Sequence, residues 1–235
     1  MAKRSSSSMA ILGLLGIDRW TPYELVQHMK RSTIHYIWPR AESKIYEEPK
    51  RLAAAGYAKV TADRGNPRRT RYWISAAGRR VLTEWLEQPG AGVSFESEGA
   101  LKILFAEHGT KEQLLATIDS MRADALAQLG RRAGVFDEVV RDGPPYPDRI
   151  HQSALVFELV HRLHTAVVEW ADFAEERVRQ WPRVAPDQDM RTEALRLVHD
   201  IRDRAAATVA SHSQMLGTAR GERVSVSPSR LAAAL

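Results

Sequence analysis

The sequence predicts a mainly α-helical protein with two domains and a β-hairpin in the first of them. Three observations support this prediction. Most segments of the 235-residue chain repeat apolar residues three or four positions apart, the spacing of an amphipathic helix. Two short β-like runs, at 57–60 and 72–74, flank a stretch rich in turn residues. The run QPGAG at 88–92 interrupts the helical pattern and predicts a boundary between domains at 9–89 and 90–216.

Composition narrows the possible classes of protein. The chain has no cysteine, which excludes disulfides and thiolate metal sites and fits a reducing cytoplasm. No apolar run approaches the length of a membrane span, so we expect a cytoplasmic protein that works near the bacterial nucleoid, with no membrane partner.

The charge is divided unevenly between the two predicted domains. Lys and Arg outnumber Asp and Glu by 16 to 8 through residue 88, whereas the counts are 18 and 21 from residue 89 onward. The first part therefore suits a polyanionic partner. A membrane surface is the weaker alternative, because the basic residues lie on a predicted hairpin and not on a long amphipathic helix.

The first domain is expected to begin after a flexible, serine-rich tail at 1–8. Residues 9–17 are densely apolar, as expected of a short helix at the centre of a small domain. A second helix begins at Thr21, which can cap it, with Pro22 at the first helical position and Glu24 able to bond back to the cap.

The next helix is predicted from about residue 40 to Ala55, with Gly56 at its end. Pro49 lies inside this stretch, and we expect it to kink the helix near Ile45 and Tyr46 or to divide it into two short helices. Basic residues alternate with its apolar stripe and can face outward.

A hairpin follows directly, and its connecting sequence DRGNPRRTR holds four arginines. Ser75 then caps another helix that ends near residue 88. A basic helix followed by a basic hairpin is the arrangement in which a winged helix-turn-helix meets DNA. We therefore predict for 9–89 a winged helix-turn-helix of three or four helices with a β-hairpin wing.

The second domain, 90–216, is predicted to be entirely helical and to mediate dimerisation, and the tail at 217–235 to be disordered. Its longest helix, about 149–181, carries an approximate heptad seam. The seam residues, expected at a dimer interface, are Val156, Val160, Leu163, Val167, Trp170 and Ala174. Phe157, Phe173 and Trp181 are candidates to line an aromatic ligand pocket, although aromatic residues at helical spacing more often belong to a core.

The combination of features over about residues 10–88 resembles the PadR family of transcriptional regulators. The features are the apolar ILGLLG helix, Trp38-Pro39, Ile45-Tyr46, Gly56-Tyr57, the arginine-rich wing and the SAAG helix start at 75–78. The helical remainder is similar to the long C-terminal region of the larger PadR subfamily. The resemblance implies a homodimer on a roughly palindromic operator, with repression relieved by a small, often aromatic, molecule. Ala41 departs from the family, which often carries a small hydroxyl residue there.

Side chains of a recognition helix enter the major groove, where we place Glu42, Ser43 and Lys44, with Arg40 and Lys50 on phosphates. Tyr46 fits a half-buried core position or, as the resemblance implies, a phosphate contact. The wing arginines are expected to anchor to phosphates or enter the minor groove. The residues predicted to bind double-stranded DNA are Arg40, Glu42, Ser43, Lys44, Tyr46, Lys50, Arg64, Arg68, Arg69 and Arg71.

The sequence fits two other functions less well. An enzyme is disfavoured because the sequence lacks a cysteine nucleophile, a glycine-rich phosphate loop and a GxSxG motif. Glu158, His161 and His164 have metal-ligand spacing but no further ligand in register, so we expect no metal and no cofactor. The alternative function is a helical protein-interaction scaffold with non-specific nucleic-acid affinity, which has no need of an arginine-rich wing.

Overall fold

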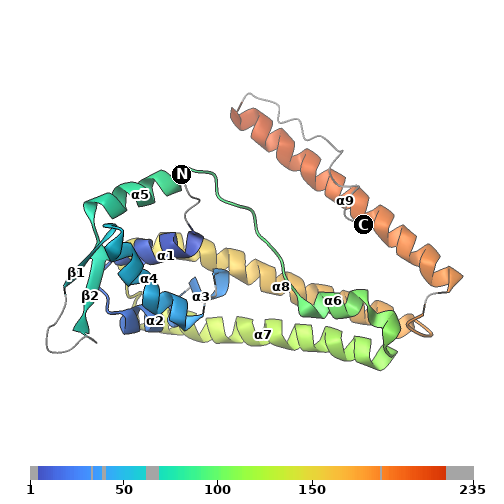
Figure 1. Cartoon of the computed structure of the whole chain (residues 1–235). Coiled ribbons are helices and arrows are strands. Elements are labelled where there is room, and N and C mark those ends of the chain that lie inside the picture. Colours follow the sequence, from blue (N-terminus) through green and yellow to red (C-terminus); the bar gives the residue numbers. More distant parts are fainter. Residues whose placement is uncertain (1–4, 33, 39–40, 62–68, 186, 221–235) are drawn as a thin grey trace.

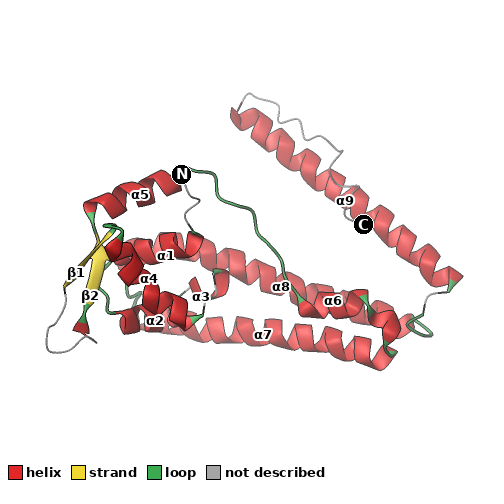
Figure 2. Ribbon diagram, viewed as in Figure 1, coloured by secondary structure: helices red, strands yellow, loops and turns green. Residues whose placement is uncertain are grey.

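The computed structural model describes residues 5–32, 34–38, 41–61, 69–185 and 187–220. These residues form a small N-terminal domain followed by long helices (Figures 1 and 2). The N-terminal elements are α1 (Ser6–Leu15), α2 (Pro22–Arg31), α3 (Ile34–Ile37), α4 (Glu42–Ala54), β1 (Ala58–Thr61), β2 (Arg71–Ile74) and α5 (Ala76–Leu86). The C-terminal helices are α6 (Glu98–Leu104), α7 (Lys111–Asp142), α8 (Ile150–Gln180) and α9 (Gln188–Arg220), with short 3-10 turns at Ala106–His108 and Pro147–Arg149. The predicted mainly helical fold with a hairpin wing is confirmed.

The core of the N-terminal domain is built around α1. This helix packs against α4, α5 and β2 on different sides, which is why its sequence is apolar nearly all round. Leu12 and Leu15 of α1 and Leu25 and Val26 of α2 are fully buried.

Two helix starts show how local chemistry sets the boundaries. The capping box of α2 forms as predicted: the Thr21 backbone N–H donates to the Glu24 carboxylate (2.8 Å) and the Glu24 N–H to the Thr21 hydroxyl (3.2 Å). The predicted tail at 1–8 is wrong for its last residues, because the Ser5 hydroxyl accepts from the Ser8 N–H (3.3 Å) and α1 begins at Ser6.

Helix α4 runs unbroken through Pro49, so a division into two helices is wrong. The ring of Pro49 is fully buried in the domain core, and this burial offsets the hydrogen bond that a proline removes from a helix. Ala41 occupies the N-cap without a side-chain hydrogen bond, and Gly56 follows the helix with φ +76°, the conformation for which glycine was predicted.

The wing is an antiparallel pair of strands in which Ala58 lies opposite Ile74 and Thr61 opposite Arg71. Its outer part, 62–68, lies outside the described residues. Ser75 joins the wing to α5: its hydroxyl accepts from the Gly78 N–H (3.0 Å) and donates to the Gly56 carbonyl (2.7 Å).

Gly78 is expected to be the least replaceable glycine of this domain. A Cβ added to it would lie 2.1 Å from the carbonyl oxygen of Tyr57, whereas a Cβ on Gly13 would meet nothing within 4 Å. Gly78→Ala should therefore lower the free energy of unfolding by about 2 kcal/mol or more. The control Gly13→Ala, inside α1, should raise it by up to about 1 kcal/mol. Urea unfolding measures both, and equal effects would contradict this packing.

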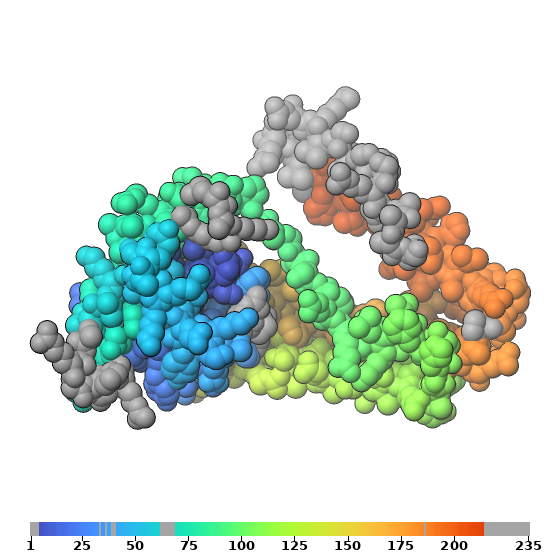
Figure 3. Space-filling model, viewed as in Figure 1, coloured from blue at the N-terminus to red at the C-terminus, as the bar shows by residue number. Residues whose placement is uncertain are grey.

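In the C-terminal part, α7 and α8 form a long antiparallel hairpin, and α6 packs on α7. The hairpin buries Leu114 and Ile118 of α7 against Ala171 and Val178 of α8. Helix α9 leaves the far end of the hairpin as a separate arm (Figure 3). It extends to Arg220, so the first four residues of the predicted tail are helical. None of the described helices is both long enough and apolar enough to span a bilayer.

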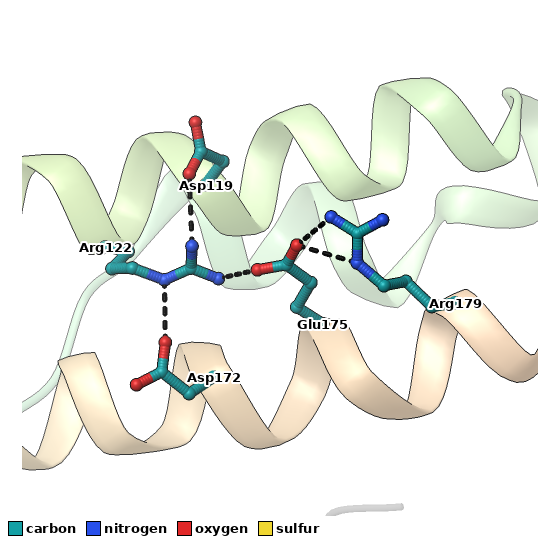
Figure 4. A network of polar contacts seen from close by, with 5 residues as sticks. All are labelled: Asp119, Arg122, Asp172, Glu175 and Arg179. Carbon is teal, nitrogen blue, oxygen red and sulfur yellow. Dashed lines mark hydrogen bonds and ion pairs between the residues drawn. The ribbon is translucent and has the colours of Figure 1, made fainter.

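An ion-pair network fastens α7 to α8 (Figure 4). The guanidinium of Arg122 lies 3.0 Å from Asp172 and 3.3 Å from Asp119, and it also binds Glu175, which Arg179 contacts from the next turn. The hydrogen bond from Arg122 and, to a smaller extent, the one from Arg179 hold the pKa of the Glu175 carboxyl below its ordinary value.

This lowered pKa predicts an acid-sensitive contribution to stability. It should be fully present above the unfolded-state pKa of Glu175 and lost as the pH falls through the lower folded-state pKa. The difference in unfolding free energy between wild type and Glu175→Gln should therefore shrink between about pH 7 and about pH 3. Glu176→Gln, at an exposed neighbouring position, is the control. A difference independent of pH would contradict the assignment.

Candidate nucleic-acid interface

Helix α4 has one buried and one outward face. Ile45, Pro49 and Leu52 point into the core. The opposite side, which we call the recognition face, exposes Ser43, Tyr46, Glu47 and Lys50. Successive members of this set are three, one and three positions apart in the sequence, so they lie on one side of the helix. The face offers hydroxyl, carboxylate and ammonium groups to solvent, and such groups read base edges and bind phosphates.

The sequence-predicted residues of α4 divide between this face and its surroundings. Ser43, Tyr46 and Lys50 lie on it, and Lys44 is exposed on its flank. Glu42 instead forms an ion pair with Lys30 of α2 at 2.5 Å. Arg40 lies outside the described residues.

Glu47 was not predicted, although it lies in the middle of the recognition face. The signal was available in the sequence. Ile45 and Leu52 define the buried stripe of the helix, and the positions opposite that stripe are 43, 46, 47 and 50. A carboxylate there can accept a hydrogen bond from cytosine N4 in the major groove.

The wing arginines have different environments. Arg64 and Arg68 lie outside the described residues, and Arg69 is exposed just before β2. Arg71 bends back to the domain: its guanidinium donates to the Arg19 carbonyl (2.8 Å) and to the Glu24 carboxylate (2.9 Å). In this structure Arg71 fixes the first residue of β2 to α2.

Two further arginines, Arg19 and Arg51, brace the wing and α4. The guanidinium of Arg19 lies 4.6 Å from the centre of the Trp73 ring, a cation–π contact against β2. Arg51, near the end of α4, donates to the Ser8 hydroxyl (2.6 Å) and pairs with Glu48. These contacts fix α4 and the wing relative to α1 and α2.

The predicted seam residues of α8 divide between two faces. Val160 is buried and Ala174 packs against α7 of the same chain, whereas Leu163 and Trp170 are 45% and 37% exposed. Val156 and Val167 are half-buried. The outward side forms a continuous apolar stripe, consisting of Leu155, Leu159, Leu163, Trp170 and Phe173. Helix α9 exposes a second stripe, consisting of Leu195, Val198, Ile201 and Val209.

The three candidate pocket residues do not meet within one chain. Phe157 packs edge-to-face on Phe136 with ring centres 5.0 Å apart. Phe173 lies under Arg177, and Trp181 packs beside the buried cluster of α7 and α8. Trp181 also borders a cavity of about 400 Å³ at the α8–α9 corner, whose other walls include three carboxylates.

The histidines of α8 have no metal-like arrangement in the part of the chain that the structure describes. Glu158 pairs with Arg162 at 2.7 Å, and Nδ1 of His164 lies 2.8 Å from the Val160 carbonyl oxygen. No group of three or more potential ligand side chains among the described residues could hold a metal ion.

Known proteins resemble this chain in both sequence and structure. No family profile matches it. It is 24% identical over 183 residues to the "Probable transcriptional regulator Rv1176c" of Mycobacterium tuberculosis, covering 73% of this chain and 96% of that protein. Its structure is similar to the PadR-like transcriptional regulator BC1756 of Bacillus cereus, with a TM-score of 0.62, 15% identity, and coverage of 74% and 98% of the two chains.

A second solved neighbour is Bacillus subtilis PadR. Its complex with operator DNA gives a TM-score of 0.62 at 20% identity, covering 74% of this chain and 99% of PadR. Its complex with p-coumaric acid gives a TM-score of 0.59 at 21% identity, covering 74% of this chain and 98% of PadR. The chain has the PadR fold. The resemblance predicted from the sequence is thus confirmed in the PadR-type winged helix and in the long helical C-terminal region.

Proposed function

We propose that this PadR-fold protein is a sequence-specific, double-stranded DNA-binding transcriptional regulator, working as a dimeric repressor in the cytoplasm. The observation that carries the proposal is the polar recognition face of α4, in the domain that holds the excess of positive charge and whose wing sequence contains four arginines. The structural similarity to a PadR solved with operator DNA supports it.

DNA binding would use the two elements differently. The recognition face enters the major groove, with Ser43 and Glu47 at base edges and Lys50 at a backbone phosphate. Arg69 and the arginines at 64 and 68 contact phosphates beside it. The contacts of Arg71, Arg19 and Arg51 within the domain fix the angle between α4 and the wing before DNA arrives, which lowers the entropy lost on binding.

We further propose that a second copy of the chain covers the exposed stripes of α8 and α9. Each stripe presents large apolar side chains to solvent along several turns, and Leu163 and Trp170 from the predicted seam lie within the first. A two-fold dimer presents two recognition helices, which fits a palindromic operator.

The effector is proposed to be a small aromatic molecule, since B. subtilis PadR is known with p-coumaric acid. Phe157 and Phe173 are on α8, so the dimer can bring them together with residues of the second copy. A ligand that favours a dimer with mismatched recognition helices would release the operator. Stabilisation of the dimer against heat by a panel of aromatic acids would identify it.

The salt dependence of DNA affinity tests the wing. Arg68→Ala with Arg69→Ala should weaken binding similarly on all duplexes and reduce the slope of log K against log[salt] by about 2, because each lost phosphate contact removes about 0.9. Arg79→Ala with Arg80→Ala, an equal change of charge on exposed positions of α5, is the matched control. An unchanged slope in the wing variant would remove these residues from the phosphate contacts.

A further inference from the structure

The turn between α7 and α8 connects the C-terminal hairpin to the winged helix. Tyr146, in this turn, packs against the buried core of the N-terminal domain. Among the described members of that core and its border, it is the one residue that comes from the C-terminal part. The covalent linker does not supply such a contact, because residues 87–96 are exposed throughout. Figure 1 shows the chain between α5 and α6 as an extended segment without helix or strand. Tyr146 is therefore a packed contact between the two parts, which the linker does not provide.

This contact is the outer end of a stack of three aromatic rings, those of Tyr146, His28 and Trp20. The Tyr146 ring meets the ring of His28 on α2 edge-to-face, with centres 5.7 Å apart. His28 in turn lies 4.8 Å from the ring of Trp20, which is 8% exposed. Burial lowers the pKa of His28 at the middle of the stack, because desolvation disfavours the charged ring. Packed rings have few alternative positions, so a displacement of the first is transmitted to the next.

The stack ends at strand β2 of the wing. Trp20 exchanges two backbone hydrogen bonds with Tyr72 of β2, at 3.0 and 2.8 Å, and its indole N–H donates to the Leu14 carbonyl (2.9 Å). The preceding residue, Arg19, contacts Trp73 and accepts from Arg71 through its carbonyl. Both residues of the segment 19–20 are thus attached to β2, Trp20 through its backbone and Arg19 through its side chain and its carbonyl.

We propose that Tyr146 is a positioning residue that couples the α7–α8 hairpin to the wing through His28 and Trp20. A tilt of the hairpin, as in a rearranged dimer, moves Tyr146 and with it the segment that anchors β2. The wing then changes its angle to α4. This inference rests on the proposed function for its biological meaning, but the coupling itself is a property of the protein without DNA.

Hydrogen–deuterium exchange on the full-length protein tests the coupling directly. In Tyr146→Ala, exchange should rise in the peptides covering 18–28 and 71–74 and stay unchanged in α4 and in the first turns of α1. Tyr146→Phe, which keeps the ring, should behave as wild type. Val140→Ala, at an α7 position that is 86% exposed, is the control for truncation on the same hairpin. Unchanged exchange at 71–74, or a uniform rise across residues 9–86, would overturn the proposal, because a merely stabilising residue gives one of these results.

Operator affinity gives the second measurement. Tyr146→Ala should weaken binding by roughly two- to thirtyfold, the range of measured couplings between distant sites, while the protein remains dimeric. Full affinity in this variant would overturn the coupling. If the wild-type protein bound no DNA, the proposed function would fail, but the exchange experiment would still decide whether Tyr146 and β2 are coupled.

Discussion

Removal of α9, by ending the chain at residue 187, is expected to yield a monomer that binds operator DNA about 100-fold more weakly or worse. The apolar stripe of α9 has no cover within the described chain, and we propose a second copy as its partner. A dimer binds its second half-site as an intramolecular event, which raises affinity by about 10²–10⁴. Sedimentation velocity measures the oligomeric state, and fluorescence anisotropy measures the affinity.

A point substitution tests the same interface without deletion. Ile201→Asp places a charge in the α9 stripe, and Ala207→Asp places the same charge on the opposite, exposed face of the helix. The first should dissociate the dimer and the second should not. A truncated chain that remains dimeric, or two variants with equal association, would show that the interface lies elsewhere.

Glu47→Ala is expected to alter base preference at one symmetric pair of operator positions. A good side-chain contact to a base edge is worth about 1–3 kcal/mol of discrimination, and a dimer makes it twice. Selection from a random duplex library should show reduced preference for cytosine at those two positions, with the rest of the site retained. The control Glu96→Ala removes an exposed carboxylate from the linker.

The same selection with Lys44→Ala tests a residue predicted from the sequence. Lys44 lies on the flank of the recognition face, so its loss should change base preference less than the loss of Glu47. An unaltered preference in the Glu47 variant would exclude this face from direct base readout.

Much of the fold follows from short-range chemistry that the sequence displays. The capping box at Thr21 and the glycine after α4 each depend on neighbours within a few residues, and the structure has both. Ser5 follows the same chemistry, but a run of serines is equally typical of a tail, and only the packing of α1 distinguishes the two.

The contacts that shape the candidate site are long-range. Arg71 reaches the Arg19 carbonyl across 52 positions and Arg51 reaches Ser8 across 43. A sequence shows these arginines as free positive charges, because their partners are brought near only by the fold. Glu47 differs, since its place follows from helical spacing alone.

The α8 seam shows a different limit. Its repeat predicted an apolar contact, but α8 has apolar residues on two sides. Val160 is buried within the chain, whereas Leu163 is exposed to solvent. A periodic pattern gives the spacing of a contact surface but does not name the partner. The identity of that partner must come from the arrangement of the other helices.

Selective capture of genomic duplexes by the purified protein, with the bound sites footprinted, tests the central claim most directly. We predict a saturable complex at low ionic strength and an enriched, roughly palindromic site whose half-sites lie about 10–10.5 base pairs apart, or a multiple of that distance. The affinity should fall steeply with added salt. If neither random nor genomic duplexes bind at low ionic strength, the recognition face and the wing do not serve DNA recognition.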